Sequence, residues 1–451
     1  MKISLNKTIL IFFCIIASIN LTGCISQNAL NRELNKVPQN NLAFVQKNQA
    51  KQKLISNENA TKLRTDYLKK FYLPWTAPFT WQSKTGIRNN ISKIINTYKH
   101  NPGWGANQNL HTKTWADDIE RNLNLDNYPN KQQRAITIRI TALRALPADS
   151  PSFSDWDIAG KGYPFDNLQT AYLGANIPLY ILHTTLDKQW DLVITPYNCY
   201  GWIKSLDLAT VDGKFVDTWR QNRYVTALQD EKPLLDLQQH YRTSTEIGAI
   251  YPLIKATPLF YRVLTTTSDT HGKAQLISAK LSKNTAQIWP LKLTKQNIAF
   301  LANNFLDNPY GWGDLYNYRD CSETIRSLFA PFAVWLPRNS AAQAETGKFI
   351  SLKDLDNEQK QNLILKLGKP FTTLIWMPGH IMLYVGEKNG KIYVFHNPWG
   401  IHTVNYFGGE SGRAVIGRTV ITPLDIGKNY ANTKWVYLDL VEGISILTQD
   451  M

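Results

Sequence analysis

The chain has 451 residues, of which 43% are apolar and 12% aromatic, enough for packed cores in about two to four domains, which excludes a wholly disordered protein. Lysine and arginine outnumber aspartate and glutamate by 50 to 35, and this net charge of +15 favours an anionic partner: nucleic acid, an acidic polymer or a membrane surface. The four cysteines, Cys14, Cys24, Cys199 and Cys321, form no disulfide framework and no Cys-x-x-Cys pair, which argues against a disulfide-stapled fold or a zinc ribbon.

The first 23 residues form a predicted export signal. Lys2 and Lys7 precede an unbroken apolar run from Ile9 to Ala17, which is far shorter than the roughly 20 residues of a membrane span. The ending Leu21-Thr22-Gly23-Cys24 resembles the lipobox of bacterial lipoproteins. That resemblance implies cleavage before Cys24 and lipidation of this cysteine, and Ile25 in the next position implies sorting to the outer membrane. The alternative is an ordinary secretory signal with a coincidental cysteine.

Residues 24–60 are expected to be a flexible tether between the lipid anchor and the folded body. The stretch from 25 to 60 contains 8 Asn and 5 Gln, and Phe44 is its only aromatic residue. So little apolar surface does not offset the entropy lost on ordering. A coil of this length has an r.m.s. reach of about 30–35 Å. After removal of the signal the protein keeps a basic charge, because only Lys2 and Lys7 are lost.

An N-terminal helical segment is predicted at 61–125, followed by β-rich sequence. Leu68, Phe71 and Tyr72 recur at helical spacing until Pro74 breaks the pattern. From 136 to 211 the chain changes to short apolar runs divided by Pro, Gly, Asp and Asn, which is typical of a small β-barrel.

Two motifs in this barrel carry a family resemblance. The runs Gly162-Tyr163-Pro164-Phe165-Asp166-Asn167-Leu168-Gln169 and Tyr200-Gly201-Trp202-Ile203 resemble the bacterial SH3-like domain that precedes some NlpC-type cell-wall peptidases. The stretch from 223 to 290 has a similar texture with weaker motifs, and we interpret it as a second SH3-like barrel.

The chemistry is predicted in the last 160 residues. Thr294 can cap a helix, and a turn-rich stretch from 308 to 314 then leads to Cys321 at the start of the next predicted helix. The free N–H groups and dipole of a helix N-terminus stabilise a thiolate, which favours a nucleophilic role. The residues alone leave a buried structural cysteine as an equal alternative.

A base for this thiol is predicted on a strand downstream. His380 begins an alternating strand, and His396 ends the next strand. A two-residue turn at Asn389-Gly390 would place the two histidines on opposite faces, because a shift of one residue exchanges the faces of a strand. We therefore predict a three-residue loop that pairs Glu387 with Lys391. His396 would then lie diagonally from His380, within reach of a ring-to-ring hydrogen bond.

The order Cys321, His380, His396 resembles the NlpC-type, papain-like peptidases of bacterial murein. The resemblance extends to Pro309-Tyr310-Gly311-Trp312-Gly313, Asp320-Cys321-Ser322 and Leu336-Pro337-Arg338. It implies an α+β protein in which a papain-like NlpC-type catalytic domain follows two small SH3-like β-barrels and an N-terminal helical segment. The expected division is a signal at 1–23, a tether at 24–60, the helical segment at 61–125, barrels at 126–211 and 212–292, and the peptidase at 293–451.

The resemblance also implies roles for single residues. Cys321 would be the nucleophile, His380 the base and His396 the third polar residue, while Tyr310, Asp320 and Ser322 would bind the free amine of a substrate's N-terminal L-Ala. Each of these last three has an alternative, a helix cap for Asp320 or Ser322 and simple packing for Tyr310. Arg338 is expected to stabilise a loop. A metal site of Cys321, His380, His396 and His402 lacks zinc-type spacing, and no cofactor is implied.

The implied activity is hydrolysis of murein stem peptides between D-glutamate and an L-diamino acid, with preference for a free N-terminal L-Ala. The partners would be murein stem peptides and a membrane that holds the lipid anchor, with the monomeric protein facing the periplasm, on the outer membrane. Export argues against nucleic acid. A rival interpretation is a murein-binding or scaffolding lipoprotein with an inactive peptidase domain, which the intact Cys321 and His380 disfavour.

Overall fold

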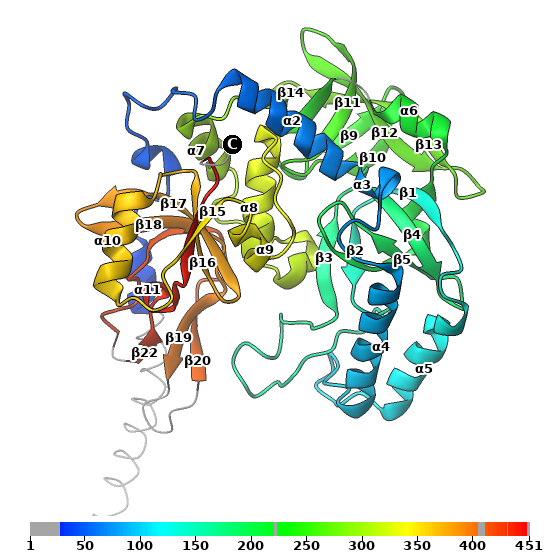
Figure 1. The fold of residues 1–451 in the computed structure, drawn as a ribbon, viewed down its shortest axis with the longest axis horizontal. Helices are drawn as coiled ribbons and strands as arrows, with labels where there is room; N and C mark the ends of the chain where they lie inside the picture. Colours follow the sequence, from blue (N-terminus) through cyan, green and yellow to red (C-terminus); the bar gives the residue numbers. More distant parts are fainter. Residues whose placement is uncertain (1–27, 221–222, 405–410, 431, 449–451) are drawn as a thin grey trace, which may run out of the picture.

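The computed structural model describes residues 28–220, 223–404, 411–430 and 432–448 (Figure 1). Figure 1 shows the C-terminal domain, coloured yellow to red, beside two β-rich domains in green and cyan. Helix α2, in blue, runs across the top of the view between them. The predicted α+β fold is confirmed in its order of elements: an N-terminal helical segment, two β-rich domains and a mixed C-terminal domain. The domain bounds remain predictions from the sequence.

The flexible tether is a wrong prediction for residues 28–60. Residues 28–34 are helical, and the side chains of Leu30 and Leu34 are 0% and 2% exposed in a core shared with the C-terminal domain. The amide side chain of Gln39 donates to the carbonyl of Ile421 (2.9 Å) and accepts from its N–H (2.9 Å), as an added strand would. The few apolar residues of this segment are therefore enough, because they complete a core that the C-terminal domain supplies.

The N-terminal helices begin at the caps that their sequence offers. Ser83 caps α4 through the N–H of Gly86, and Thr112 caps α5 through the N–H of Trp115. Both helices bury isoleucines against the first barrel. The helical elements of this segment are η1 (Asn41–Phe44), α2 (Asn57–Phe71), α3 (Leu73–Thr76), α4 (Lys84–His100), α5 (Lys113–Leu123) and η2 (Leu125–Asn127).

Each SH3-like domain contains a seven-stranded antiparallel sheet. The first has the order β3-β2-β6-β5-β4-β1-β7 and the second β10-β9-β13-β12-β11-β8-β14. The first comprises β1 (Gln133–Thr137), β2 (Thr141–Arg144), β3 (Gln169–Leu173), β4 (Pro178–Thr184), β5 (Trp190–Ile194), β6 (Tyr200–Lys204), η3 (Ser205–Asp207) and β7 (Leu208–Thr210). After α6 (Gly213–Trp219), the second comprises β8 (Tyr224–Ala227), β9 (Pro233–Asp236), β10 (Tyr241–Ser244), β11 (Ile250–Ala256), β12 (Phe260–Ser268), β13 (Ala274–Ser282) and β14 (Ala286–Trp289).

The C-terminal domain packs helices on a six-stranded sheet of order β15-β23-β16-β17-β18-β21, beside a small sheet of order β20-β19-β22. Its helices are α7 (Lys295–Asn303), η4 (Trp312–Asn317), α8 (Cys321–Phe329), η5 (Ala330–Phe332), α9 (Ser340–Ala344), α10 (Asn357–Leu367) and α11 (Tyr437–Leu440). Its strands are β15 (Lys348–Ser351), β16 (Thr373–Met377), β17 (His380–Lys388), β18 (Lys391–His396), β19 (Gly400–Val404), β20 (Ser411–Val415), β21 (Val420–Pro423), β22 (Thr433–Trp435) and β23 (Gly443–Ile446). Thr294 caps α7, as predicted.

The register of β17 and β18 differs from the prediction and still brings the histidines together. Lys388 pairs with Lys391, so the turn is the two-residue Asn389-Gly390, both with positive φ, rather than a three-residue loop. A bulge between Tyr384 and Gly386 then shifts the pairing, and Leu383 faces Phe395. The extra residue in β17 restores the shared face that the turn alone would have removed.

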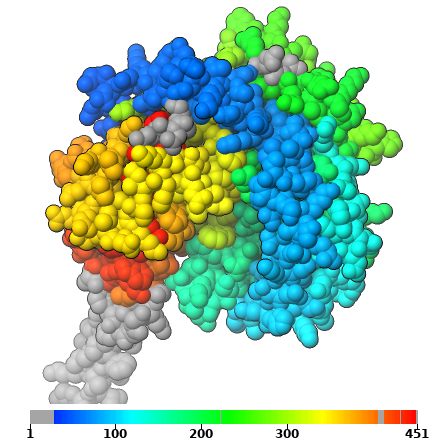
Figure 2. Space-filling view, viewed as in Figure 1, coloured from blue at the N-terminus to red at the C-terminus, as the bar shows by residue number. Residues whose placement is uncertain are grey.

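The first SH3-like domain contacts the loop that precedes α8. The side-chain amide of Gln169 donates to the carbonyl of Gly313 (2.9 Å), and the backbone N–H of Tyr172 donates to the Asp314 carboxylate (3.2 Å). On the face shown in Figure 2, the N-terminal helices (blue) lie between the C-terminal domain (yellow) and the SH3-like domains (green to cyan). The site described below is therefore built at a junction of domains.

Candidate active site

Cys321 is the first residue of α8 and lies beside the start of β17. Asp320 caps the helix, because its carboxylate accepts from the N–H of Glu323 (2.9 Å). The Cys321 Sγ atom lies 4.0 Å from the carbonyl oxygen of Gly379, the residue that precedes His380. The helix start and the histidine strand, 58 residues apart, are thus brought together as the sequence predicted.

The thiol of Cys321 is held in its neutral form, contrary to the expectation of a stabilised thiolate. The residue is 6% exposed. Burial raises the pKa of Cys321 to about 12, and the negative charge of Asp320 adds to this increase. The N–H groups of Ile381 and Ser322 oppose it only in part. Desolvation therefore outweighs the helix N-terminus, and the thiol needs a base that removes its proton.

His380 and His396 form a hydrogen-bonded pair. The Nε2 atom of His380 lies 2.8 Å from Nδ1 of His396, as the shared face predicts, and Nε2 of His396 lies 2.9 Å from Oγ1 of Thr422. This chain of contacts orients the His380 ring and leaves its Nδ1 atom for another proton partner. Burial lowers the pKa of His380 to about 4 and lowers the pKa of His396 well below its usual value. Both rings are therefore neutral at pH 7.

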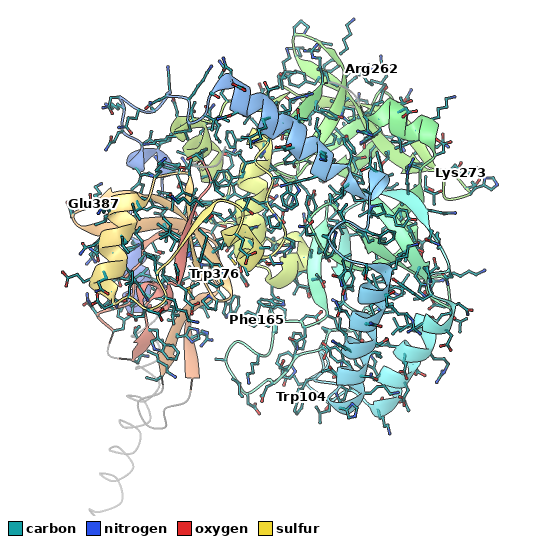
Figure 3. All side chains as sticks on the ribbon, viewed as in Figure 1. Trp104, Phe165, Arg262, Lys273, Trp376 and Glu387 are labelled. Carbon is teal, nitrogen blue, oxygen red and sulfur yellow. The ribbon has the colours of Figure 1, made fainter. Side chains whose placement is uncertain are left out.

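A cleft of about 300 Å³ opens beside His380. Tyr437 forms part of its wall and stacks on the His380 ring, with centroids 5.8 Å apart. Phe165, from the first SH3-like domain, packs edge-on against Trp312 (5.2 Å) and Trp399 (5.7 Å) of the catalytic domain. Figure 3 shows Phe165 between these two domains. The first SH3-like domain therefore supplies one side of the cleft.

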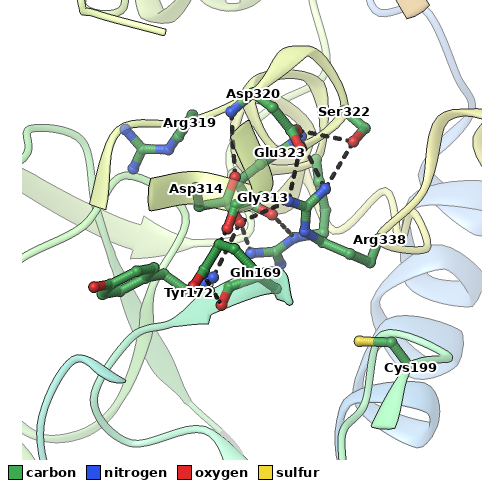
Figure 4. Close-up of polar contacts among 12 residues, drawn as sticks. Gln169, Tyr172, Cys199, Gly313, Asp314, Arg319, Asp320, Ser322, Glu323 and Arg338 are labelled. Atoms are coloured by element: carbon green, nitrogen blue, oxygen red, sulfur yellow. Dashed lines mark hydrogen bonds and ion pairs between the residues drawn. The ribbon is translucent and has the colours of Figure 1, made fainter. Parts of the chain in front are cut away.

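Beneath the helix start, Arg338 joins two buried carboxylates (Figure 4). Its guanidinium lies 2.9 Å from Asp314 and 2.8 Å from Asp320, and it donates to the Ser322 hydroxyl (2.8 Å). Burial raises the pKa of Asp314 well above its usual value, with the Asp320 charge adding and Arg338 opposing. Arg338 thus stabilises the loop around Cys321, as expected, and Asp314 is a member that the sequence did not single out.

The three predicted amine-binding residues occupy different positions. Tyr310 lines the cleft. The hydroxyl of Ser322 donates to Asp320 (2.9 Å), and Asp320 is already a helix cap and a partner of Arg338. Asp320 is thus a helix cap, which the sequence left as an alternative. Contact of the three residues with a substrate amine stays a prediction.

Cys199 and Cys321 are free thiols. Within the described ranges, no group of three or more His, Cys, Asp or Glu side chains could hold a metal ion, and no helix is long and apolar enough to cross a membrane. Cys24 lies outside the described residues. Thr422 and Tyr437 were missed from the sequence, since neither belongs to a recognisable motif.

Comparisons with known proteins agree with this architecture. Three family models match in chain order: the N-terminal NLPC_P60 stabilising domain at 12–128, an SH3 domain of SH3b1 type at 151–204, and an SH3 domain of SH3b2 type at 212–258. An NlpC/P60 endopeptidase from Photobacterium damselae subsp. piscicida superimposes with a TM-score of 0.83 at 28% identity, over 91% of this chain and 97% of that one. Over nearly its whole length the chain is thus similar to an NlpC/P60 endopeptidase.

It is therefore a cysteine peptidase of NlpC/P60 type with a stabilising domain and two bacterial SH3 domains. An NlpC/P60 family protein from Bacillus cereus is also similar, with a TM-score of 0.47 at 17% identity, over 69% of this chain and 98% of that one. The search of curated proteins found no match. The NlpC/P60 assignment covers the catalytic region through the Photobacterium structure, because the three family models end at residue 258.

Proposed function

We propose that Cys321 is the nucleophile of a peptidase reaction, His380 its general base and His396 the residue that orients His380. The observation that carries this proposal is the 2.8 Å contact between the two rings, beside a thiol that lies 4.0 Å from Gly379. With Nε2 bound to His396, Nδ1 of His380 is the nitrogen that takes the thiol proton.

The proposed reaction has two steps. Sγ of Cys321 attacks the amide carbonyl, its proton passes to His380, and His380 returns that proton to the leaving amine as the C–N bond breaks. Water then gives a proton to His380 and attacks the thioester. The C–S bond breaks, the carboxylic acid leaves, and His380 returns the proton to Sγ, which regenerates the thiol. Low pKa values of both histidines keep His380 unprotonated, which is the form that acts as a base.

The substrate in this proposal is peptidoglycan, cleaved in its stem peptide between D-glutamate and the L-diamino acid. Similarity to an NlpC/P60 endopeptidase supports the class of substrate, and the resemblance of the catalytic motifs supports the bond. A preference for stems with a free N-terminal L-Ala is supported by the loop of the first SH3-like domain, where Phe165 closes against Trp312 and Trp399. A glycan-linked stem would need more space on that side.

The test uses purified protein and L-Ala-γ-D-Glu-diaminopimelate, with the products read by mass. Wild type should release L-Ala-D-Glu, and the Cys321→Ala and His380→Ala variants should release none. Cys199→Ala is the matched control, because it removes the other described free thiol and should keep wild-type turnover. Turnover by Cys321→Ala would reject the nucleophile, and no turnover by wild type would favour the rival scaffolding function.

A parallel peptide with an acetylated amine tests the preference for a free N-terminus. Slower cleavage of the acetylated peptide, or of intact disaccharide-linked stems, is expected because of the closed side of the cleft. Equal rates on all three substrates would show that the enzyme acts on intact wall as readily as on released fragments.

We also propose that Cys24 is lipidated and holds the enzyme on the periplasmic face of the outer membrane. The support is the lipobox-like ending at residues 21–24. Cys24→Ser should move the protein from the membrane fraction to the soluble fraction. Continued membrane association of this variant would reject the anchor.

A further inference from the structure

The small sheet of the C-terminal domain places the side chains of His402, Arg413 and Trp435 in one row across its strands. In the pairing of β19 with its two neighbours, His402 lies opposite Arg413 on one side and opposite Trp435 on the other. Directly opposed residues of neighbouring strands project from the same face of a sheet. All three residues line the cleft that also contains His380. This face of the small sheet is therefore a wall of the active-site cleft.

Arg413 is a cation without a described counterion. Its Nη1 atom donates to the carbonyl of Gly412 (2.9 Å), and within the described residues no carboxylate lies within ion-pair distance of it. The residue is half-buried, and burial lowers the pKa of the Arg413 guanidinium. Holding a partly desolvated cation without a partner costs free energy. A site with that cost is suited to an anion that arrives with the substrate.

The surroundings of Arg413 are electropositive. Among the described residues that line the cleft are Lys161 and Arg413 but no aspartate and no glutamate. The charges of Arg413 and Lys434 add to the burial that lowers the pKa of His402 to about 4. Lys161 belongs to a loop of the first SH3-like domain. The Arg413 side chain lies close to the same loop, because a Cβ atom added to Gly160 would be 3.4 Å from the Nη2 atom of Arg413.

Arg413 is also close to the catalytic pair. Tyr437 stacks on His380 with centroids 5.8 Å apart, and its phenol interacts electrostatically with Arg413. One aromatic side chain therefore links the base to the cation. A charged group bound by Arg413 would therefore lie in the cleft that contains His380.

We propose that Arg413, supported by His402 and Lys161, binds a free carboxylate of the stem peptide and so selects peptides in which that carboxylate is not amidated. This inference rests on the proposed function for the identity of the peptide. The α-carboxylate of diaminopimelate is free only where this residue ends the peptide. Two other carboxylates beside the bond stay free in longer stems, the α-carboxylate of D-glutamate and the distal carboxylate of diaminopimelate. They share one chemistry, and an arginine fork fits either of them.

Binding to the inactive Cys321→Ala variant separates this inference from catalysis. Calorimetry would compare L-Ala-γ-D-Glu-diaminopimelate with three peptides: one with D-isoglutamine, one with diaminopimelate amidated at its distal carboxylate, and one with L-Lys instead of diaminopimelate. Loss of a charge-assisted contact should weaken binding about tenfold to a hundredfold. Weaker binding of the isoglutamine peptide alone would identify the D-glutamate carboxylate, and weaker binding of the other two would identify the distal one.

The same measurements with Arg413→Gln, in the Cys321→Ala background, test the residue. The preference for the free carboxylate should disappear in Arg413→Gln and survive in part in Arg413→Lys. Arg121→Gln is the matched control, because this arginine lies on α5, is 71% exposed and pairs with Asp118 of its own helix. It removes the same charge and should keep the preference.

The results that overturn the inference are distinct from those that overturn the function. Equal binding of all four peptides, no binding of any, or an unchanged preference in Arg413→Gln would each reject the carboxylate site. These outcomes do not depend on turnover, and the comparison of the four peptides needs no substitution at Arg413, so misfolding of an Arg413 variant cannot produce equal binding of the peptides. Absence of cleavage by wild type, with the preference in binding intact, would reject the proposed reaction and leave the carboxylate site standing.

Discussion

Replacing Arg338 by methionine should destabilise the catalytic domain strongly. Arg338 is 6% exposed and lies between Asp314, which is 2% exposed, and Asp320, which is 9% exposed. Methionine fills much of the same space but leaves these two carboxylates without their shared cation. Breaking a buried ion pair from one side costs about 3–5 kcal/mol of unfolding free energy. The Ser322 hydroxyl loses a donor as well.

The loss of unfolding free energy caused by Arg338→Met should increase with pH. Without Arg338, the folded-state pKa of Asp314, which burial already holds well above the unfolded value of about 3.9, rises further. Groups with raised folded-state pKa values stabilise the fold below the unfolded pKa and lose that contribution as the pH rises through the folded pKa. The difference in unfolding free energy between wild type and Arg338→Met should therefore be larger at pH 8 than at pH 5.

Urea unfolding, followed by tryptophan fluorescence at both pH values, measures this difference. Arg139→Met is a suitable control, because its pair with Asp207 is on the surface, with the arginine 61% exposed, and should contribute less than about 1 kcal/mol. In the folded fraction, kcat should fall more than KM rises, since Asp320 caps the helix that begins at Cys321. A loss below about 1 kcal/mol together with a large increase in KM would refute this reasoning and assign Arg338 to the substrate.

Three further outcomes are expected. His396→Ala should lower kcat by about a hundredfold or more in assays on the stem peptide, because His380 loses its orienting contact, and a change below tenfold would contradict that role. The acidic limb of kcat/KM should lie near pH 4, since burial lowers the pKa of His380 to about 4 and only the neutral ring accepts a proton; a limb near pH 6.5 would contradict it. Leu34→Ala should cost about 2–5 kcal/mol in urea unfolding, whereas Leu42→Ala, at a side chain 38% exposed, should cost much less, and equal small losses would restore the flexible tether.

The parts of the site that could be predicted from the sequence are those with a local signal. An acid before Cys321 predicts a capped helix with the cysteine in its first turn, and the alternation after His380 predicts a strand. These local elements supply the thiol and the base. The electrostatics of the thiol were predicted with the wrong sign, because the effect of the helix N-terminus is visible in the sequence while the depth of burial is not.

The register of the histidine strands shows why a correct face can follow from a wrong turn. Asn389-Gly390 is a strong signal for a two-residue turn, and the structure has that turn. The extra residue that the prediction placed in the turn is in strand β17. The bulge there lies just before Gly386, whose φ is 150°. An isolated glycine inside a strand pattern is the usual sign of a bulge, and it was available in the sequence. Thr422 and Asp314 had no such sign, since their roles depend on contacts between distant segments.

The packing of the N-terminal segment changes where the proposed anchor would hold the enzyme. Only residues 25–27 separate Cys24 from the first described helical residue at position 28, so the extended chain spans at most about 14 Å rather than the 30–35 Å of a free tether. A lipid on Cys24 would thus keep the folded body close to the membrane surface. Inserting about 30 Gly and Ser residues after Cys24 would add a reach of about 30 Å. This insertion should increase the release of stem peptides from intact sacculi by membrane-bound enzyme, while kcat/KM on a soluble stem peptide stays unchanged. Unchanged release from sacculi would show that the short connection does not limit access to the wall, and it would favour released fragments as the substrate.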